Sequence, residues 1–274
     1  MRKTINREFK LTGIGLHKGL AASVEFKPQM GNEGIRFFLK DSKIPIKAAL
    51  ENVNSTLRGT NLSNGVSSIY TVEHILSALF AFDIDDIDII LSDIEPPALD
   101  GSSINYCKEI NKVGILLKEQ EERRKFILDK KIDFSYKDSF YEAQPFEDSV
   151  IECVYENNHP LIGSQFFSFR LNSENYLKEI APARTFGFIH EIDYLRKNNL
   201  ALGGSLENAI VLSEDSILNK EPLRFKDEFV RHKILDFIGD ISLMGFRLEN
   251  MKIKAIKPSH NANFNFAKFL REVA

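Results

Sequence analysis

The chain has 274 residues, a length that suits one large domain or two small ones. Its hydrophobic fraction of 43% supplies ample apolar material for a packed core and excludes a disordered chain. The net charge of −3 comes from mixed positive and negative residues, whereas a nucleic-acid binder usually shows a basic excess, so no nucleic-acid partner is expected.

The first half of the chain alternates short strand-like and helix-like segments. Residues 22–26 and 34–39 are predicted to be short strands. The stretch 72–82 (VEHILSALFAF) is predicted to be a helix, because its apolar residues recur every three or four positions. Residues 88–91 are predicted to form a buried strand. That strand ends before residues 95–97 (EPP), since proline cannot continue a central strand.

A charged run at residues 118–125 separates this half from the next, and 120–124 is the best candidate for a domain boundary. The run carries both signs, which predicts a solvated linker or a surface helix. Beyond it the pattern of elements starts again. The predicted elements are strands at 125–128 and 150–154, helices at 172–180 and 227–243, and a half-buried strand at 248–256.

The two halves share one loose feature, a predicted helix that carries a histidine near an Ile-Leu pair and leads into a strand. The histidines are His74 and His232. This favours two domains of related topology only weakly, because chance similarity explains it about as well. With the charged run between them, the predicted domains span 1–118 and 126–274.

The cellular compartment is indicated by the cysteines and by the apolar runs. Cys107 and Cys153 form neither a CxxC metal clip nor a disulfide framework, which fits a reducing compartment. The first ten residues (MRKTINREFK) lack the apolar region of a signal peptide. No apolar run approaches the roughly 18 residues that cross a bilayer. We therefore expect a soluble, cytoplasmic protein without a membrane-spanning segment.

Two segments carry candidate metal ligands. His232 and Asp236 are four residues apart on a predicted helix, so both side chains fall on one face and could hold one metal ion. Read alone, this spacing also fits an ordinary surface or capping pair. The second segment pairs His74 with Glu73, as in half of a zinc hydrolase site, although His74 could be a core residue and Glu73 could face solvent.

Together the two segments supply two histidines and one aspartate. Three protein ligands leave a fourth position open for water, which is the composition of a catalytic zinc site rather than a structural one. The nitrogen and oxygen ligands favour Zn²⁺ and leave iron(II) as an alternative. His260, with Asp240, is a further candidate. A histidine paired with a carboxylate can stay protonated and act as a general acid, although an exposed loop histidine is the simpler interpretation.

Several short motifs run through the chain in a fixed order. They are TGIGLH (12–17), TVEH (71–74), EPPALDGS (95–102), ARTFGF (183–188), LGGS (202–205), LRFKDEFVRHKILDFIGD (223–240) and SH (259–260). In these motifs and in their spacing the chain resembles, nearly end to end, the bacterial UDP-3-O-acyl-N-acetylglucosamine deacetylases, the zinc amidases of lipid A synthesis. Each motif alone is weak, and their shared order makes the resemblance specific.

The resemblance implies a role for each matching residue. Glu73 matches the general base, and His260 matches the general acid or electrostatic stabiliser that Asp240 orients. Thr185 matches the hydroxyl that helps to hold the oxyanion. The residues matching the zinc ligands are His74, His232 and Asp236. The residues expected to contact the substrate are Phe186, Lys233, Gly204 and Glu191.

The resemblance also implies a fold and a reaction. The fold is α+β, with two domains of similar topology. Each is a sheet backed by two helices, and the helix layers pack between the sheets. An insert near 187–219 is expected to form an apolar passage for an acyl chain, and its candidate lining residues, about half of them expected to be core, are Ile192, Leu195, Leu200, Leu202, Ile210 and Val211. The implied reaction is zinc-dependent hydrolysis of the acetamide of UDP-3-O-(3-hydroxyacyl)-N-acetylglucosamine, the committed step of lipid A synthesis.

The sequence departs from the family pattern at one catalytic turn. Ser259 stands where the family usually has glycine, and the turn is expected to be less permissive because glycine alone visits positive φ freely.

Two other functions stay open: a zinc hydrolase with a different sugar or amide substrate, and a nucleotide-sugar binding protein without catalysis. The complete set of catalytic residue types argues against the second. The leaving amine takes its proton from His260, or from Glu73 after Glu73 has accepted one. The protein is expected to be a monomer.

Overall fold

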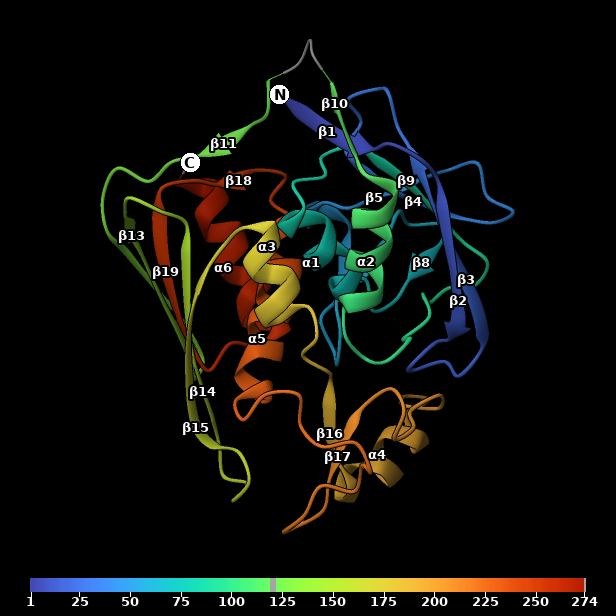
Figure 1. Ribbon diagram of the computed structural model, residues 1–274, viewed down its shortest axis with the longest axis vertical. Helices are drawn as coiled ribbons and strands as arrows, with labels where there is room; N and C mark the ends of the chain where they lie inside the picture. The colour runs from blue at the N-terminus through green and yellow to red at the C-terminus, as the bar shows by residue number, and fades with distance from the viewer. Residues whose placement is uncertain (119–121, 274) are drawn as a thin grey trace.

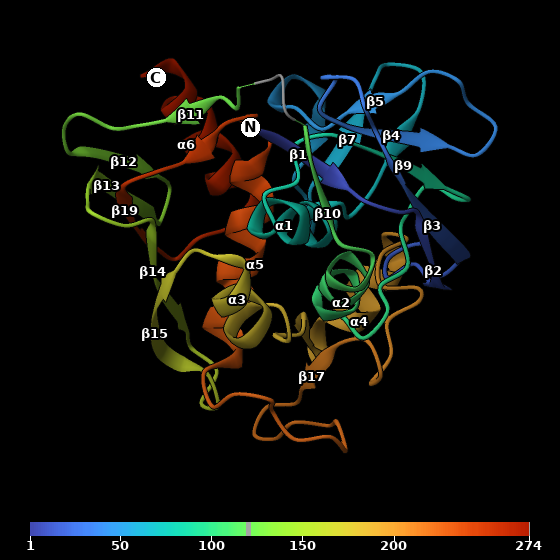
Figure 2. The ribbon, with the colours of Figure 1, turned by 45° about the horizontal axis from the view of Figure 1, so that its top comes forward.

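The computed structural model describes residues 1–118 and 122–273. Two five-stranded sheets form its outer layers, and the main helices lie between them (Figures 1 and 2). The predicted α+β class is confirmed, with both helices and sheets in each half of the chain. Among the residues described, no helix combines the length and the apolar character that crossing a bilayer would require.

The two sheets have the same strand order. In each, the last strand in sequence lies at the centre, antiparallel to the second strand and parallel to the third. In spatial order the first sheet comprises β2 (Phe9–Ile14), β3 (Ala21–Pro28), β9 (Ile87–Leu91), β4 (Ile35–Leu39) and β5 (Ile46–Lys47). The second comprises β12 (Ile132–Tyr136), β13 (Ser139–Pro145), β19 (Met251–Ile256), β14 (Val150–Asn157) and β15 (Gly163–Arg170).

One helix precedes and one follows the central strand of each sheet. These are α1 (Glu73–Ala81) and α2 (Ile104–Val113) in the first half, and α5 (Glu228–Ser242) and α6 (His260–Glu272) in the second. Helices α1 and α5 pack against each other, and a single hydrophobic core runs through both halves. The apolar face predicted for the first helix is buried, with Ile75, Leu76 and Leu79 at most 1% exposed.

A glycine allows α1 and α5 to approach closely. A Cβ atom added to Gly239 of α5 would lie 2.2 Å from the carbonyl oxygen of Glu73, at the start of α1. No side chain fits in that space, because real Cβ contacts are not shorter than about 3 Å. Gly239 therefore lets the backbone of the first half touch the helix that carries the candidate metal ligands.

Each half carries an insert at the same point, between its fourth strand and its first helix. The first insert contains η1 (Leu50–Asn52), β6 (Val53–Ser55), β7 (Asn61–Ser63) and β8 (Ser68–Ile69). The second contains α3 (Ser173–Asn175), the π-helical turn η2 (Tyr176–Ile180), β16 (Phe186–Phe188), η3 (Ile189–Glu191), α4 (Ile192–Lys197) and β17 (Ile210–Leu212). The helical segment expected at 172–180 is thus present as two short pieces.

Each half has a short pair of strands at the end of the molecule where the N-terminus lies (Figure 1). They are β1 (Arg2–Ile5) with β10 (Ile115–Lys118), and β11 (Lys125–Phe126) with β18 (Arg247–Leu248).

Part of the charged run, 119–121, lies outside the described residues. The expectation of a solvated run is wrong for Lys118 and Arg123. Their side chains are 6% and 10% exposed, because ion pairs to Asp86 and Asp85 draw them against the first half.

Two predicted strands differ in extent from those observed. The strand expected at 125–128 pairs only over Lys125–Phe126. The strand expected at 248–256 is divided at Asn250, whose φ of 53° lies in the left-handed region that asparagine tolerates better than most residues. The segment before Asn250 pairs with β11, and the segment after it forms the centre of the second sheet.

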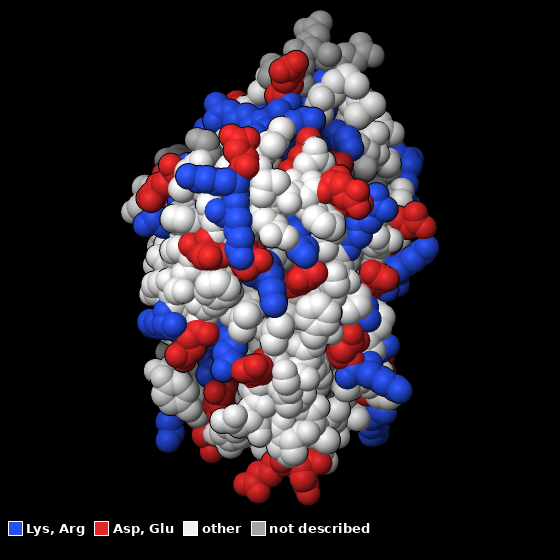
Figure 3. Space-filling view, turned by 90° about the vertical axis from the view of Figure 1, so that its left-hand side faces the viewer, with Lys and Arg blue, Asp and Glu red and all other residues white. Residues whose placement is uncertain are grey.

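The outer surface of the second sheet carries both signs of charge (Figure 3). Its strands alternate buried and outward residues, as a half-buried strand does. Some outward residues form cross-strand ion pairs, such as Lys131 with Glu142 at 2.6 Å and Lys257 with Glu156 at 2.8 Å. This sheet therefore presents a mixed-charge face to solvent and its apolar face to the helices.

Candidate active site

Helices α1 and α5 bring three possible metal ligands together. His74 lies in the first turn of α1, while His232 and Asp236 lie one turn apart on α5. Asp236 Oδ1 is 3.7 Å from His74 Nε2 and 3.3 Å from His232 Nε2. One ligand atom from each residue falls within 4.8 Å of the others, so the three side chains converge on one point.

The protonation states of this cluster suit metal binding. Burial lowers the pKa of His74 to about 4 and that of His232 to about 3, so both rings are neutral near pH 7. His232 Nδ1 lies 3.1 Å from the carbonyl oxygen of Ala183, an arrangement in which Nδ1–H donates and Nε2 keeps its lone pair for a ligand. Two neutral imidazoles and a carboxylate form the donor set of a catalytic zinc site.

Asp236 is held as a carboxylate. Burial alone would raise the pKa of Asp236. His232 and Lys233 outweigh burial and hold this pKa well below its usual range. Lys233 Nζ donates to Asp236 Oδ2 at 2.8 Å, while Oδ1 faces the two histidines. Asp236 therefore offers one oxygen to the cluster, and the other is fixed by the lysine.

Glu73 lies beside the cluster and is 3% exposed. Burial raises its pKa to about 7, and the nearby carboxylates of Asp236 and Asp240 add to the effect. Its Oε2 accepts a hydrogen bond of 2.9 Å from the Thr60 backbone N–H, which orients the carboxyl group. A carboxylate with a pKa near 7 is matched to accepting and returning a proton near neutral pH.

His260 faces Glu73, with 3.9 Å between His260 Nε2 and Glu73 Oε1. Burial lowers the pKa of His260, but Asp240, Asp236 and Glu73 outweigh this and raise it to about 10. His260 Nδ1 is 2.9 Å from Asp240 Oδ2. The ring is therefore an imidazolium near pH 7, held in one orientation by Asp240.

Asp240 is fixed by further hydrogen bonds. The Thr60 hydroxyl donates to Asp240 Oδ1, and the Asn263 amide donates to Oδ2 at 2.7 Å. The turn before His260 requires no positive φ at Ser259. Ser259 has an extended φ of −146°, which any residue adopts, and its side chain accepts from the Ala262 N–H at the start of α6.

The cluster opens into a pocket of about 190 Å³, called here the metal-ligand pocket. Its lining includes Thr185, Phe186, Lys233 and Glu191, all expected from the sequence. Lys233 Nζ lies 5.3 Å from the centre of the Phe186 ring. Asp240 is not in the lining, because it is 1% exposed and lies behind His260.

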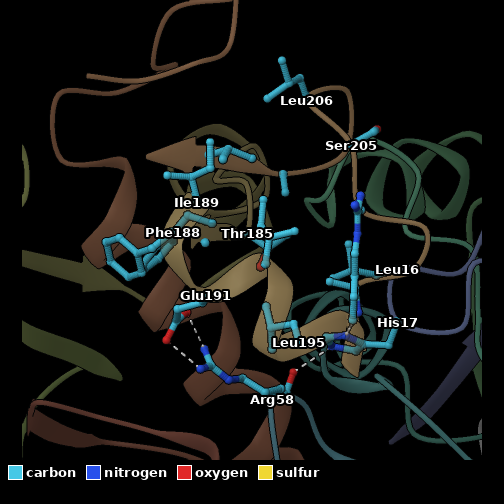
Figure 4. A pocket seen from close by; sticks show the side chains of 18 of the residues that line it. Leu16, His17, Arg58, Thr185, Phe188, Ile189, Glu191, Leu195, Ser205 and Leu206 are labelled. Atoms are coloured by element: carbon cyan, nitrogen blue, oxygen red, sulfur yellow. Dashed lines mark hydrogen bonds and ion pairs between the residues drawn. The ribbon is translucent and has the colours of Figure 1, made fainter. Parts of the chain in front are cut away.

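A larger cavity of about 300 Å³, called here the apolar cavity, adjoins this pocket (Figure 4). The second insert forms most of its wall, and Gly204 is part of it. Three of the six candidate lining residues line it: Ile192, Leu195 and Val211. The other three do not: Ile210 is fully buried in the core, Leu202 is 47% exposed, and Leu200 lies outside the lining.

Sequence reasoning missed several residues that touch the site, among them Thr60, Arg58 and Asn263. Thr60 and Arg58 come from the connection between β6 and β7, a polar loop without a periodic pattern. Asn263 lies one turn after His260 on α6, so the i, i+3 spacing on that helix was the available signal for it. Nothing in the local sequence indicates that Arg58 pairs with Glu191, 133 positions away.

Three side chains able to bind one metal ion, beside a carboxylate able to accept a proton, are the arrangement that metal-dependent hydrolases share. Comparison with known proteins narrows this class. A family model described as UDP-3-O-acyl N-acetylglycosamine deacetylase matches residues 2–272. The chain therefore belongs to the UDP-3-O-acyl-N-acetylglucosamine deacetylase family.

Individual relatives agree with this assignment. The chain is 42% identical to the UDP-3-O-acyl-N-acetylglucosamine deacetylase of Helicobacter hepaticus, over 97% of this chain and 89% of the relative. It is 41% identical to the protein of the same name from Wolinella succinogenes, over 98% of this chain and 90% of the relative. The corresponding Campylobacter jejuni subsp. jejuni protein is 43% identical over 89% of this chain and 83% of its own length.

Proposed function

We propose that the protein hydrolyses the acetamide of UDP-3-O-(3-hydroxyacyl)-N-acetylglucosamine, releasing acetate and the free amine, as the committed step of lipid A synthesis. The observation that carries this proposal is that the metal-ligand pocket and the apolar cavity adjoin. A substrate with an acetamide beside a long acyl chain needs both. The two cavities share six lining residues: Leu16, Arg58, Thr185, Phe186, Phe188 and Glu191.

We assign His74, His232 and Asp236 as ligands of Zn²⁺, with iron(II) as the alternative ion. The neutral imidazoles, the ionised aspartate and the mutual distances of the ligand atoms fit this ion. Bound zinc supplies Lewis-acid chemistry, which polarises a carbonyl group and lowers the pKa of water towards 7.

The remaining catalytic residues handle protons and charge. Glu73 accepts a proton from the attacking water at one carboxylate oxygen. The Thr185 hydroxyl donates to the oxyanion that develops on the acetamide. His260 faces the same point as an imidazolium, with Asp240 fixing its Nδ1–H, so Nε2–H is available to protonate the leaving amine. Glu73, once protonated, is the second possible donor.

The apolar cavity is the proposed site of the acyl chain. Each methylene removed from water contributes about 0.8 kcal/mol, so several of them strengthen binding by orders of magnitude. Phe186, Lys233, Gly204 and Glu191 are the proposed substrate contacts, because each lines one or both cavities. We also propose that the two halves are domains over 1–118 and 126–274, with the acyl-chain insert near 187–219. Their identical strand orders support this division.

The same proposal places the protein in the cytoplasm. Cys107 and Cys153 are both buried as free thiols, which suits a reducing compartment. The protein is expected to act as a monomer, because both candidate ligand helices and the catalytic His260 belong to one chain.

A deacetylation assay with metal analysis on the same sample tests the function. The acylated UDP-sugar should be deacetylated far faster than UDP-N-acetylglucosamine, and about one zinc should be found per active chain. Equal rates on the two substrates would point to a hydrolase with another substrate. A metal-free protein that binds UDP-sugars without turnover would point to a non-catalytic binding protein.

A further inference from the structure

Arg58 and Glu191 form an ion pair between the two inserts (Figure 4). Arg58 lies between β6 and β7 of the first insert, and Glu191 ends η3 of the second. The pair is bidentate, with Arg58 Nη2 2.8 Å from Glu191 Oε1 and Arg58 Nη1 3.1 Å from Oε2. Two inserts at equivalent points of the repeated fold therefore meet through these charges.

The backbone of Arg58 is also fixed. Its φ of 61° is in the left-handed region, and its carbonyl oxygen lies 3.0 Å from His17 Nε2. The second ring nitrogen of His17 accepts from the Ala201 N–H of the second insert at 3.2 Å. The guanidinium group is thus held in position by its own backbone as well as by Glu191.

The ion pair stands where the two cavities join, because Arg58 and Glu191 line both of them. Lys233 lines only the metal-ligand pocket, so it belongs to a different part of the site. The side chains of Arg58 and Glu191 are 41% and 25% exposed. A charged pair at the entrance of an apolar cavity implies that the ligand carries polar atoms at that point.

The proposed substrate has such atoms. Its acetamide and its ester are on neighbouring sugar carbons, so a chain that starts beside the cluster crosses the junction of the cavities with its ester carbonyl and 3-hydroxyl. The bidentate pair uses two of the five N–H groups of the guanidinium. The other three can donate, and the Glu191 oxygens keep lone pairs that can accept.

We propose that Arg58 and Glu191 recognise the polar beginning of the acyl chain. Arg58 donates to the ester carbonyl oxygen, and Glu191 accepts from the 3-hydroxyl group. This inference rests on the proposed function and adds to it a residue, Arg58, that binds the ester, and a selective role for Glu191. The protein is then selective for 3-hydroxyacyl chains over plain acyl chains of equal length.

The test compares two substrates that differ only in the 3-hydroxyl group. The unmodified protein should show a kcat/KM at least about tenfold higher on the hydroxyacyl substrate, since hydrogen bonds to charged groups are the stronger ones. Glu191→Gln should lower this ratio, because a neutral amide oxygen accepts more weakly than a carboxylate. Arg58→Ala should lower kcat/KM on both substrates, because both carry the ester carbonyl that Arg58 contacts. Glu191→Gln is nearly isosteric, so it keeps the test decisive if Arg58→Ala folds poorly. Arg170→Ala, which removes an exposed arginine paired with Asp148 and lining neither cavity, should leave the ratio unchanged.

The other outcomes are distinguishable. A preserved ratio in Glu191→Gln overturns the inference and leaves the function standing, and so does an unchanged kcat/KM on both substrates in Arg58→Ala. Weaker inhibition by UDP alone in Arg58→Ala assigns Arg58 to the diphosphate and also overturns it. The inference is also overturned if the unmodified protein shows no preference between the two substrates. No turnover of either substrate by the metal-loaded protein overturns the proposed function itself.

Discussion

The proposed roles of Glu73 and of the metal ligands are separate, although Glu73 and His74 are adjacent. Glu73→Ala should therefore keep zinc while losing a factor of about 10²–10⁴ in turnover, the usual range for a lost general base. His232→Ala should lose zinc and activity together, because two ligands bind far more weakly than three. Metal analysis and kcat on the same samples test this, with the exposed His190→Ala as the matched histidine control. Loss of zinc from Glu73→Ala would show that Glu73 is itself a ligand.

The raised pKa values of Glu73 and His260 imply a bell-shaped pH profile. Glu73 must be deprotonated, so activity rises with pH through its pKa, which burial raises to about 7. His260 must be protonated, so activity falls as pH rises through its pKa, which the carboxylates raise to about 10. A cation bound at the cluster lowers the pKa values of both Glu73 and His260. The two limbs belong to the coupled site rather than to single residues.

Asp240→Asn tests the upper limb. It removes a negative charge that raises the pKa of His260, so the high-pH limb of kcat/KM should move to lower pH. The low-pH limb should move far less, because burial is the main cause of the Glu73 shift. A high-pH limb that stays in place in this variant would show that His260 does not set it.

At the scale of elements, the contact between α1 and α5 determines how well the site is assembled. Alanine usually stabilises a helix by about 0.5–1 kcal/mol relative to glycine. At Gly239 the opposite is expected, because the added methyl group would overlap the Glu73 carbonyl. Gly239→Ala should lower the free energy of unfolding by about 1–3 kcal/mol or more. It should also lower kcat, because Glu73 moves.

Urea unfolding measures this effect. Gly187→Ala is the control, since a Cβ atom there meets nothing within 4 Å. A neutral or stabilising Gly239→Ala would contradict the close approach of the two helices.

The second insert should control chain-length selectivity. Ile192→Trp places a bulky ring in the apolar cavity, so kcat/KM should fall more on long-chain than on short-chain substrates. Leu200→Trp, in the same insert but outside the lining, should not change the ratio between chain lengths. Equal loss on both chain lengths in Ile192→Trp would mean that the acyl chain lies elsewhere.

The elements that the sequence predicted best are those whose signal is local. Helix α1 and the central strand β9 have strong apolar periodicity within a few residues. The break at Asn250 and the burial of Lys118 were not predictable in this way. The first is a backbone conformation imposed by two different strand partners, and the second depends on Asp86, 32 positions away.

The same distinction holds for the candidate site. Glu73, His74 and His232 were identifiable because short local motifs carry them, and the structure brings them together. Thr60 was not, because its partner Asp240 is 180 positions distant and both groups are simple hydrogen-bonding residues. The roles assigned to these residues stay predictions until the variants above are measured.

At the scale of the whole molecule, one hydrophobic core spans both halves. The halves should therefore unfold together, in one transition that has the same midpoint by fluorescence and by circular dichroism. Two separate transitions would show that the halves are energetically independent. The proposed zinc site forms only in the folded protein, so a zinc concentration of 100 times Kd should stabilise the protein by about 2.7 kcal/mol and raise Tm. His232→Ala should not show this rise.

The repeated strand order has a consequence for the origin of the protein. Helices α1 and α5 hold equivalent places in the two halves, and each contributes a histidine to the same cluster. An ancestor of half the length, paired with a second copy of itself, would already have placed two such helices side by side. Duplication and fusion of its gene would then have freed each copy to diverge. One half would then carry the proposed base, Glu73, and the other the proposed acid, His260, on two copies of the same strand order.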